Sequence, residues 1–595
     1  MTTPTSTSTP PQPRRRRLRR SARAAAAGAL GLVLVTGCTS GSGDGGSDGG
    51  GSGGGLLGGG DEPVVELADV PAVAVLDAEG DRSVPASEAL FTSSPVVVVV
   101  DEAADVAGAG ARAEELGVPL LVVAAPEPEP AASPSPSGSA AASSTGAAES
   151  ATASPTDDAS ASPTAGAEGG APGETAEGDS PAGFAPGADP AAVVAEVERL
   201  GAEQVLAADD ASRTWAEGAL DAEVLDAATA DVDAPGRAEA DEAGASPAPS
   251  AEGSGEGLVA LSTGQPVDLA PAASARAAGA TVEDVPGGDP RADVELVDRI
   301  SAAPPASVLA LSPAFGDVDR LTGRMAVVET GVQLPGGGQV PFPGRHMIAL
   351  YGTPGTPSLG VLGEQDLDAA IERAKEVASE YDDLVEDPVV PTFELITTVA
   401  SASAGEDGDY SYEIPPEEIR PWVEAAGEAG VYVVLDLQPG RSDFLTQAQR
   451  YESLLTYPHV GLALDPEWRL RPDQVHLRQV GQVGVDEVNE VGDWLAQLTA
   501  ENDLPPKVFL LHQFQTRMIV DRERLDMSHD ELVPLVHADG HGTPGQKLDT
   551  YRVLQQDAPA GMRWGWKNFY DEDVPTMTPA ETMDVEALPD FVSYQ

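Results

Sequence analysis

Two carboxylates two positions apart are the residues of this chain best suited to acid–base chemistry. Asp465 and Glu467 flank a proline directly after the apolar run 461–464. In an extended chain, side chains at positions i and i+2 point the same way, with Cα atoms roughly 6.5 to 7 Å apart. Burial can raise the pKa of one such carboxyl so that it donates a proton, while hydrogen bonds keep its neighbour ionised. Glycoside hydrolysis uses such a pair of carboxylates.

In this interpretation Glu467 is the general acid, and Asp465 or Asp436 is the second carboxylate. The alternative is structural: Asp465 caps the turn that follows it, and Glu467 lies in solvent. The stretch Leu464-Asp465-Pro466-Glu467-Trp468 resembles the strand-four carboxylate motif of chitinase-like barrels. It lacks the spaced aspartates that those glycoside hydrolase families carry before the glutamate. The resemblance therefore implies glycan chemistry and nothing finer.

Other polar side chains follow apolar runs in the C-terminal half of the chain, as Asp465 does. We expect them to bind substrate or to stabilise developing charge, with tryptophan as an apolar platform for a sugar ring. These residues are Glu394, His512, Gln513, Asp539, His541, Trp566 and Lys567.

A metal is an alternative for part of this set, because oxygen and nitrogen donors recur in it. The donors concerned are Asp436, Asp465, His512, His537, Asp539 and His541. No His-Glu-x-x-His spacing occurs, and no cofactor is expected. Nucleophilic mechanisms based on serine or cysteine lack support, since Gly-x-Ser-x-Gly occurs only within the Gly/Ser-rich stretch 38–60 and not as an elbow between a strand and a helix, and the only cysteine is Cys38.

The elements that must position these residues alternate between strand-like and helical runs. Seven strands are expected, at 346–351, 391–399, 431–437, 460–464, 507–513, 532–538 and 561–569. Helices are expected at 364–381, 417–429 and 485–500, and a hairpin at 327–340. This alternation predicts a TIM-like (β/α) barrel one unit short of the usual eight; an open doubly wound sheet is the alternative. Chemistry in such barrels lies at the C-terminal ends of the strands, where the candidate residues fall.

The preceding region, 61–315, shows a shorter alternation of strands and helices. The run 96–100 is five consecutive valines, which is typical of a strand buried on both faces. Strand, helix and strand in succession predict small parallel α/β units.

Four segments of this region resemble the type 2 cell wall-binding repeat, namely 86–91, 96–100, 116–122 and 197–206. Residues 258–315 resemble a second, more degenerate copy. The resemblance implies flavodoxin-like units that bind anionic wall polymers. The chain departs from the repeat where Ala207-Ala208-Asp209-Asp210 replaces its final Gly-Gly turn, and an acidic copy repels an anionic polymer. The resemblance therefore indicates the fold more than the ligand.

The N-terminus carries an export signal. Arginines within 14–20 precede the apolar run 24–35, which is too short to span a bilayer of about 30 Å. The end of that run, Val35-Thr36-Gly37-Cys38, resembles the lipobox of bacterial lipoproteins, in which the cysteine is diacylated and becomes the mature N-terminus. A plain signal peptide is the alternative. The resemblance implies lipid anchoring at Cys38, on the extracellular face of the cell membrane.

Composition divides the chain and limits its partners. The formal net charge of −63 repels nucleic acid, so no nucleic-acid partner is expected.

Low-complexity stretches predict disordered segments between the folded ones. The predicted parts are a signal peptide at 1–37, a Gly/Ser-rich tether at 38–60, an α/β unit at 61–125 and 186–230 with a disordered insertion at 126–185, a linker at 231–257, a second α/β unit at 258–315 and the barrel at 316–595.

The sequence thus predicts a lipid-anchored surface protein whose barrel hydrolyses a glycan of the cell envelope or the environment. The alternative is a non-catalytic surface module that binds a cell wall polymer or another glycan with the same residues. The expected partners are the membrane, through the lipid, and the glycan.

Overall fold

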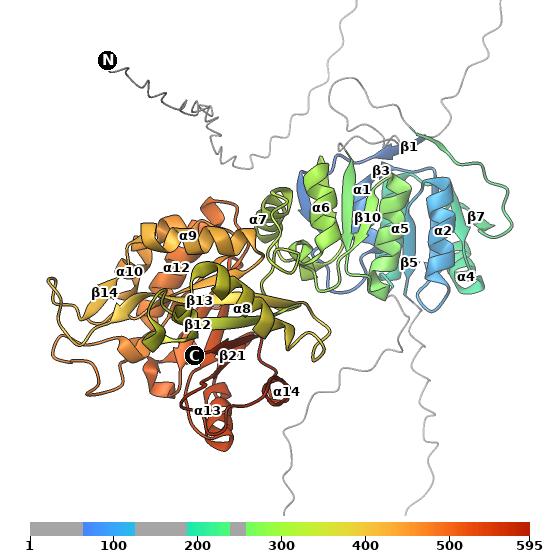
Figure 1. Cartoon of the computed structure of the whole chain (residues 1–595). Helices are drawn as coiled ribbons and strands as arrows, with labels where there is room; N and C mark the ends of the chain where they lie inside the picture. Colours follow the sequence, from blue (N-terminus) through green and yellow to red (C-terminus); the bar gives the residue numbers. More distant parts are fainter. Residues whose placement is uncertain (1–63, 125–186, 238–256) are drawn as a thin grey trace, which may run out of the picture. The chain divides into compact units, whose positions relative to one another are not determined.

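The computed structural model describes residues 64–124, 187–237 and 257–595 (Figure 1). Several predicted segments therefore lie outside the described residues. They are the signal peptide 1–37, Cys38 with the tether 38–60, the insertion 126–185 and most of the linker 231–257. None of the helices in the described part of the chain combines the length and the apolar character needed to span a bilayer.

Two four-stranded parallel sheets form the region before the barrel. The first has the order β5 (Leu120–Val123), β4 (Val96–Asp101), β6 (Gln204–Ala207) and β7 (Glu223–Asp226). The second has the order β10 (Thr281–Asp284), β9 (Leu258–Ser262), β11 (Ser307–Ala310) and β2 (Val73–Val75). A smaller sheet joins β3 (Phe91–Ser93), β1 (Val64–Leu67) and β8 (Gly236–Arg237). Parallel strands with helical crossovers agree with the predicted α/β character.

The two sheets share parts of the chain. Strand β2 comes from the segment that precedes the first sheet, yet it pairs in parallel with β11 of the second sheet. Between the sheets lies α5 (Leu269–Ala278), whose small alanines allow close packing and whose Ser274 hydroxyl accepts a hydrogen bond from Leu120 N at 3.0 Å. One apolar core includes residues of both sheets. The two predicted units therefore pack as one body.

Helices cover these sheets, and all of those that follow except α1 begin at an aspartate that caps the first turn. They are α1 (Ser83–Leu90), α2 (Val106–Leu116), α3 (Pro190–Leu200), α4 (Asp210–Ala219), α6 (Val294–Ala302) and α7 (Val318–Glu329). Asp209 caps α4, since its carboxylate accepts from Ala211 N and Ser212 N. The segment that departs from the wall-binding repeat is thus a helix start.

The C-terminal region is a closed barrel of eight parallel strands, drawn from yellow to red in Figure 1. In order around the barrel the strands are β12 (His346–Gly352), β13 (Val389–Ala400), β15 (Tyr432–Leu437), β16 (Val460–Leu464), β18 (Lys507–Gln513), β20 (Leu532–Ala538), β21 (Arg563–Asn568) and β22 (Phe591–Tyr594). All seven predicted strands are confirmed. The expectation of a barrel one unit short is wrong, because β22 pairs with both β21 and β12 and closes it.

Helices and short connections link the barrel strands. They include α8 (Leu367–Ser379), α9 (Pro416–Glu428), α10 (Phe444–Arg450), α11 (Glu452–Leu455), α12 (Val485–Glu501), α13 (Pro544–Gln555) and α14 (Pro579–Thr582). The three helices predicted in this region are confirmed.

The hairpin expected at 327–340 is wrong, because 327–329 form the last turn of α7. Leu321, Met325 and Val328 follow one another at helical spacing and are all buried, so helix packing outweighs the β preference of valine.

Candidate active site

Because side chains alternate between two faces along each barrel strand, every second residue points into the barrel interior. These interior residues form a polar layer at the C-terminal ends of the strands and an apolar layer nearer their N-terminal ends. The apolar layer includes Met347, Ala349, Val434, Leu510, Leu535 and Phe591. Two positions further along each strand, side chains face the interior again, at the C-terminal ends where the loops begin. The interior residues there are Tyr351, Glu394, Asp436, Asp465, His512, His537, Lys567 and Ser593, and all are buried. We call this polar end of the barrel interior the mouth.

His512 is the centre of the mouth. Its Nδ1 lies 3.0 Å from Asp539 Oδ2, and its Nε2 lies 2.8 Å from Glu394 Oε1 and 3.7 Å from Asp436 Oδ1. The contact with Glu394 is an ion pair when the ring is protonated. Burial alone lowers the pKa of His512, but the three carboxylates outweigh it and raise the pKa well above its usual value. His512 is therefore a positively charged imidazolium that lies close to three carboxylates.

The two carboxylate oxygens of Asp436 have different partners, because Oδ1 faces His512 and Oδ2 faces Tyr351. Its Oδ2 accepts a hydrogen bond from the Tyr351 hydroxyl at 3.0 Å, and that hydroxyl accepts one from Gln438 Nε2 at 3.2 Å. The Lys567 ammonium lies 3.3 Å from the centroid of the Tyr351 ring. Burial raises the pKa of Asp436 to about 6, against the opposing pull of His512. At neutral pH this carboxyl is mostly ionised.

Asp465 and Glu467 differ in environment although they stand two residues apart. Asp465 is buried and accepts a hydrogen bond from Glu467 N at 3.2 Å, at the start of the short helix η6 (Pro466–Trp468). Burial raises its pKa well above the usual value. Glu467 is half-buried rather than solvated, and burial together with Asp539 raises its pKa to about 7. Asp465 therefore does cap the turn, and the cap positions Glu467.

Two further titratable groups of the mouth, Asp539 and His537, both have lowered pKa values. Burial works to raise the pKa of Asp539, but the hydrogen bond to His512 outweighs it and leaves that pKa lowered. Burial and the charge of His512 hold the pKa of His537 well below its usual value. His537 is thus a neutral ring, and its Nε2 lies 2.7 Å from the Ser593 hydroxyl.

Six buried polar atoms of the mouth make no hydrogen bond within the described structure. They are Glu394 Oε1 and Oε2, Asp436 Oδ1, Asp539 Oδ1, His512 Nε2 and His537 Nδ1. Leaving such an atom unpaired in a protein interior costs about 1–3 kcal/mol, so groups of them mark places where a ligand or water completes the pairing. Four of the six are carboxylate oxygens, which accept hydrogen bonds, and two of these four, Glu394 Oε1 and Asp436 Oδ1, also lie within ion-pair distance of His512 Nε2.

The structure brings most of the predicted site residues together and separates three of them. Gln513 points out of the barrel, where its Oε1 accepts from Arg522 Nη1 at 2.7 Å. Trp566 is buried against Tyr551 and offers no exposed face. His541 is exposed on the loop after β20, with its ring 5.9 Å from that of Phe569.

Sequence reasoning missed Tyr351, Gln438 and Ser593, and treated His537 only as a metal donor. Tyr351 and Ser593 could have been found by counting in twos along their strands from Met347 and Phe591, which share their interior face. Gln438 gives no such signal, because it lies one residue beyond the end of β15.

Two groups in the described part of the chain have ligand atoms close enough to hold a metal. They are Asp493, Asp526 and His529, and Asp407, Asp409 and Glu413, whose ligand atoms lie within 4.8 Å of one another. Both groups are on the outer surface, where acidic clusters are common. The donors of the mouth are not gathered closely enough to form such a group.

No family model matches this sequence, and no curated protein is similar enough to count as a match.

Proposed function

We propose that the barrel is a glycoside hydrolase that cleaves a neutral glycan at its mouth. The observation that carries this proposal is the set of buried carboxylate oxygens on Glu394, Asp436 and Asp539 that accept no hydrogen bond. These atoms only accept hydrogen bonds when ionised, so the ligand that suits them presents many donors. A sugar supplies a hydroxyl donor at nearly every carbon. A phosphate or a polyanion supplies acceptors and negative charge, which the mouth repels.

The charge of the mouth fits the transition state of this reaction. Glycoside hydrolysis passes through an oxocarbenium-like state, in which positive charge develops on the sugar ring. The carboxylates of Glu394, Asp436 and Asp539 surround the His512 ring, and the Lys567 ammonium lies beside Tyr351. Fixed negative charge in a buried site stabilises developing positive charge without any reorganisation at the moment of reaction.

Glu467 is the general acid in this mechanism. Its pKa of about 7 keeps much of it protonated at neutral pH, and its partial exposure lets it reach the oxygen of a leaving group. Asp436 is the second carboxylate, because its pKa of about 6 leaves it mostly ionised at the same pH. Burial raises the pKa of Asp465 well above its usual value, and its carboxyl accepts a hydrogen bond from the backbone N–H of Glu467. We therefore assign the role of the second carboxylate to Asp436 rather than to Asp465.

Export and anchoring belong to the same proposal. We infer from the basic segment, the apolar run and the lipobox-like ending that Cys38 is acylated and holds the protein on the extracellular face of the membrane. Incorporation of a labelled fatty acid at Cys38 would be the direct observation of this anchor. The two parallel sheets before the barrel would then lie among the polymers of the cell envelope. Their resemblance to wall-binding repeats remains a prediction.

The test is release of reducing ends by the purified full chain from a panel of neutral polysaccharides. Wild type should release product, and Glu467→Gln should lower kcat by about 10²–10⁴-fold, because a general acid contributes on that order. Glu490→Gln is the matched control, since Glu490 is an exposed glutamate on α12. Its activity should equal that of the wild type.

The competing function is a glycan-binding module without turnover. It predicts that wild type and Glu467→Gln retain the same polysaccharides equally in affinity electrophoresis, while neither releases product. That pattern would overturn the hydrolase proposal.

A further inference from the structure

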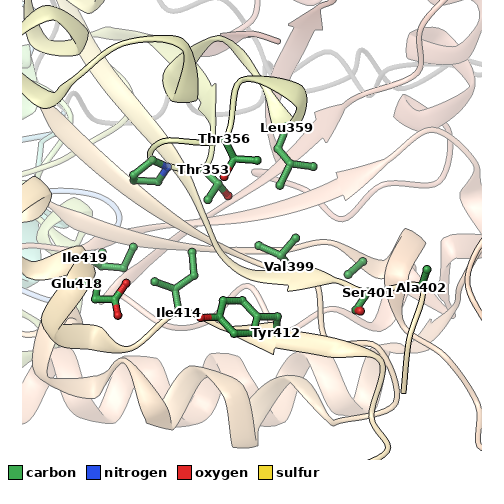
Figure 2. Close-up of a pocket in the computed structure, with 12 residues that line it drawn as sticks. Thr353, Thr356, Leu359, Val399, Ser401, Ala402, Tyr412, Ile414, Glu418 and Ile419 are labelled. Atoms are coloured by element: carbon green, nitrogen blue, oxygen red, sulfur yellow. The ribbon is translucent and has the colours of Figure 1, made fainter. Parts of the chain in front are cut away.

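A cavity of about 510 Å³ lies beside the mouth, at the rim of the barrel. Its walls come from the loop after β12, the projecting end of β13, the short strand β14 (Ser411–Glu413) and the start of α9. Figure 2 shows Thr353, Thr356 and Leu359 on one side and Tyr412, Ile414 and Glu418 on the other. A volume of this size suits a small organic ligand or one or two sugar rings.

The lining combines an apolar surface with hydroxyl groups and one carboxylate. Val399 and Tyr412 are paired across the β13–β14 ladder, so their side chains share the face that lines the cavity. Tyr412 is 62% exposed, which is unusual for a large aromatic side chain. Thr356, Ser401 and Glu418 add polar groups, and none of the twelve lining residues is Lys, Arg or His. The cavity therefore suits an uncharged ring with an apolar face and a hydroxyl-bearing edge.

One glutamine connects this cavity to the catalytic carboxylate. Gln438 Oε1 accepts a hydrogen bond from the backbone of Ala400, which lines the cavity, at 3.0 Å. Gln438 Nε2 donates to the Tyr351 hydroxyl, which in turn donates to Asp436. The cavity wall and the mouth are thus linked through three hydrogen bonds in series.

The separation of the two sites sets the length of a ligand that occupies both. Glu394 of the mouth and Val399 of the cavity belong to the same strand, β13, five residues apart. Five residues of extended chain cover about 16 Å. A monosaccharide cannot span this distance, whereas an oligosaccharide can.

We propose that this cavity is a second sugar-binding subsite, which holds a neutral hexose unit of the same chain that the mouth cleaves, with its ring on Tyr412. This inference rests on the proposed hydrolase function and specifies its substrate class. The substrate is a neutral oligosaccharide or polysaccharide, and short glycosides occupy the mouth alone.

The experiment compares chain lengths. Cello-oligosaccharides and malto-oligosaccharides of two to six residues are offered to the full chain as wild type, Tyr412→Ala and Tyr412→Phe. For the series that is cleaved, Tyr412→Ala should raise KM for the hexasaccharide about tenfold and leave kcat and the KM of the disaccharide unchanged. Tyr412→Phe should behave as the wild type, because it keeps the ring. Val553→Ala, at an exposed apolar residue on α13, is the control for surface substitution.

The two proposals fail in different ways. Cleavage with the same chain-length dependence in Tyr412→Ala and wild type would overturn the subsite and leave the hydrolase intact. If no oligosaccharide is cleaved, titration calorimetry with the hexasaccharides decides the subsite alone. Binding that Tyr412→Ala weakens supports the subsite, and binding that is absent or unchanged in that variant overturns it.

Discussion

At the scale of single residues, the charge on His512 decides the charge states around it. A neutral ring would leave Glu394, Asp436 and Asp539 as three carboxylates in a buried space with little to balance them. The protonated ring compensates all three at once. It also allows Asp436 to stay ionised while Glu467, further from the ring's direct contacts, keeps its proton. One imidazolium therefore separates an ionised carboxylate from a protonated one, as acid–base catalysis requires.

The pH dependence of hydrolysis follows from these two carboxyls. Asp436 must be ionised, and its pKa of about 6 predicts that activity falls as pH drops below that value. Glu467 must be protonated, and its pKa of about 7 predicts that activity falls as pH rises above that value. The profile of kcat/KM should therefore be bell-shaped with its maximum between pH 6 and pH 7, and each limb should approach a tenfold loss per pH unit.

The profile also tests the assignment of roles. Replacing Glu467 with Gln removes the group that titrates on the alkaline side, so the residual activity should lose that limb and keep the acid one. A profile for Glu467→Gln with both limbs unchanged would show that another group is the acid.

At the scale of elements, alternation along the strands explains what the sequence could and could not predict. The seven strands found from the sequence are long or strongly apolar, and the carboxylates at their ends mark the transition to loops. Strand β22 was missed because it has only four residues, Phe591–Tyr594, and one of them is a serine. The Ser593 side chain faces the barrel interior and contacts His537, so the polar residue in this strand is part of the candidate site. Two of the three residues that lie outside the mouth fail for a related reason, because Gln513 and Trp566 occupy strand positions that alternate with those of His512 and Lys567 and so point away from the interior.

Close packing between strands fixes the ring of His537. A Cβ added at Gly565 of β21 would lie 2.4 Å from His537 Nδ1 and 3.0 Å from Leu535 Cδ2. Gly565→Ala should therefore displace the ring from Ser593, lower the free energy of unfolding by about 1–3 kcal/mol and reduce kcat. Thermal denaturation and the glycan assay measure the two effects.

The matched control is Gly545→Ala, in the first turn of α13. A Cβ at that position meets nothing within 4 Å, so the substitution should leave stability unchanged or raise it slightly. Equal behaviour of the two variants would contradict the packing argument.

At the scale of the whole molecule, the chain returns to earlier segments to complete its sheets. Strand β2 crosses from the first segment to become an edge of the second sheet, and β22 returns to β12 to close the barrel. Local patterns in a sequence predict elements, but they carry no record of which distant element is the partner. For that reason the order of elements could be predicted, while the interlocked sheets and the closure could not.

Closure by β22 makes the last residues of this chain essential to the barrel. Removing 591–595 deletes the buried side chains of Phe591, Val592 and Tyr594, whose burial contributes about 2 kcal/mol each, and removes the Ser593 partner of His537. It also leaves β12 and β21 as unpaired edges. Because a domain is stable by only about 5–15 kcal/mol, we expect this deletion to abolish cooperative unfolding of the barrel and all hydrolysis. Circular dichroism during heating measures the first effect.

Deletion of Gln595 alone should leave the barrel folded, and Ser593→Ala should lower activity without loss of the folded state. A barrel that remained cooperative without 591–595 would mean that seven strands suffice.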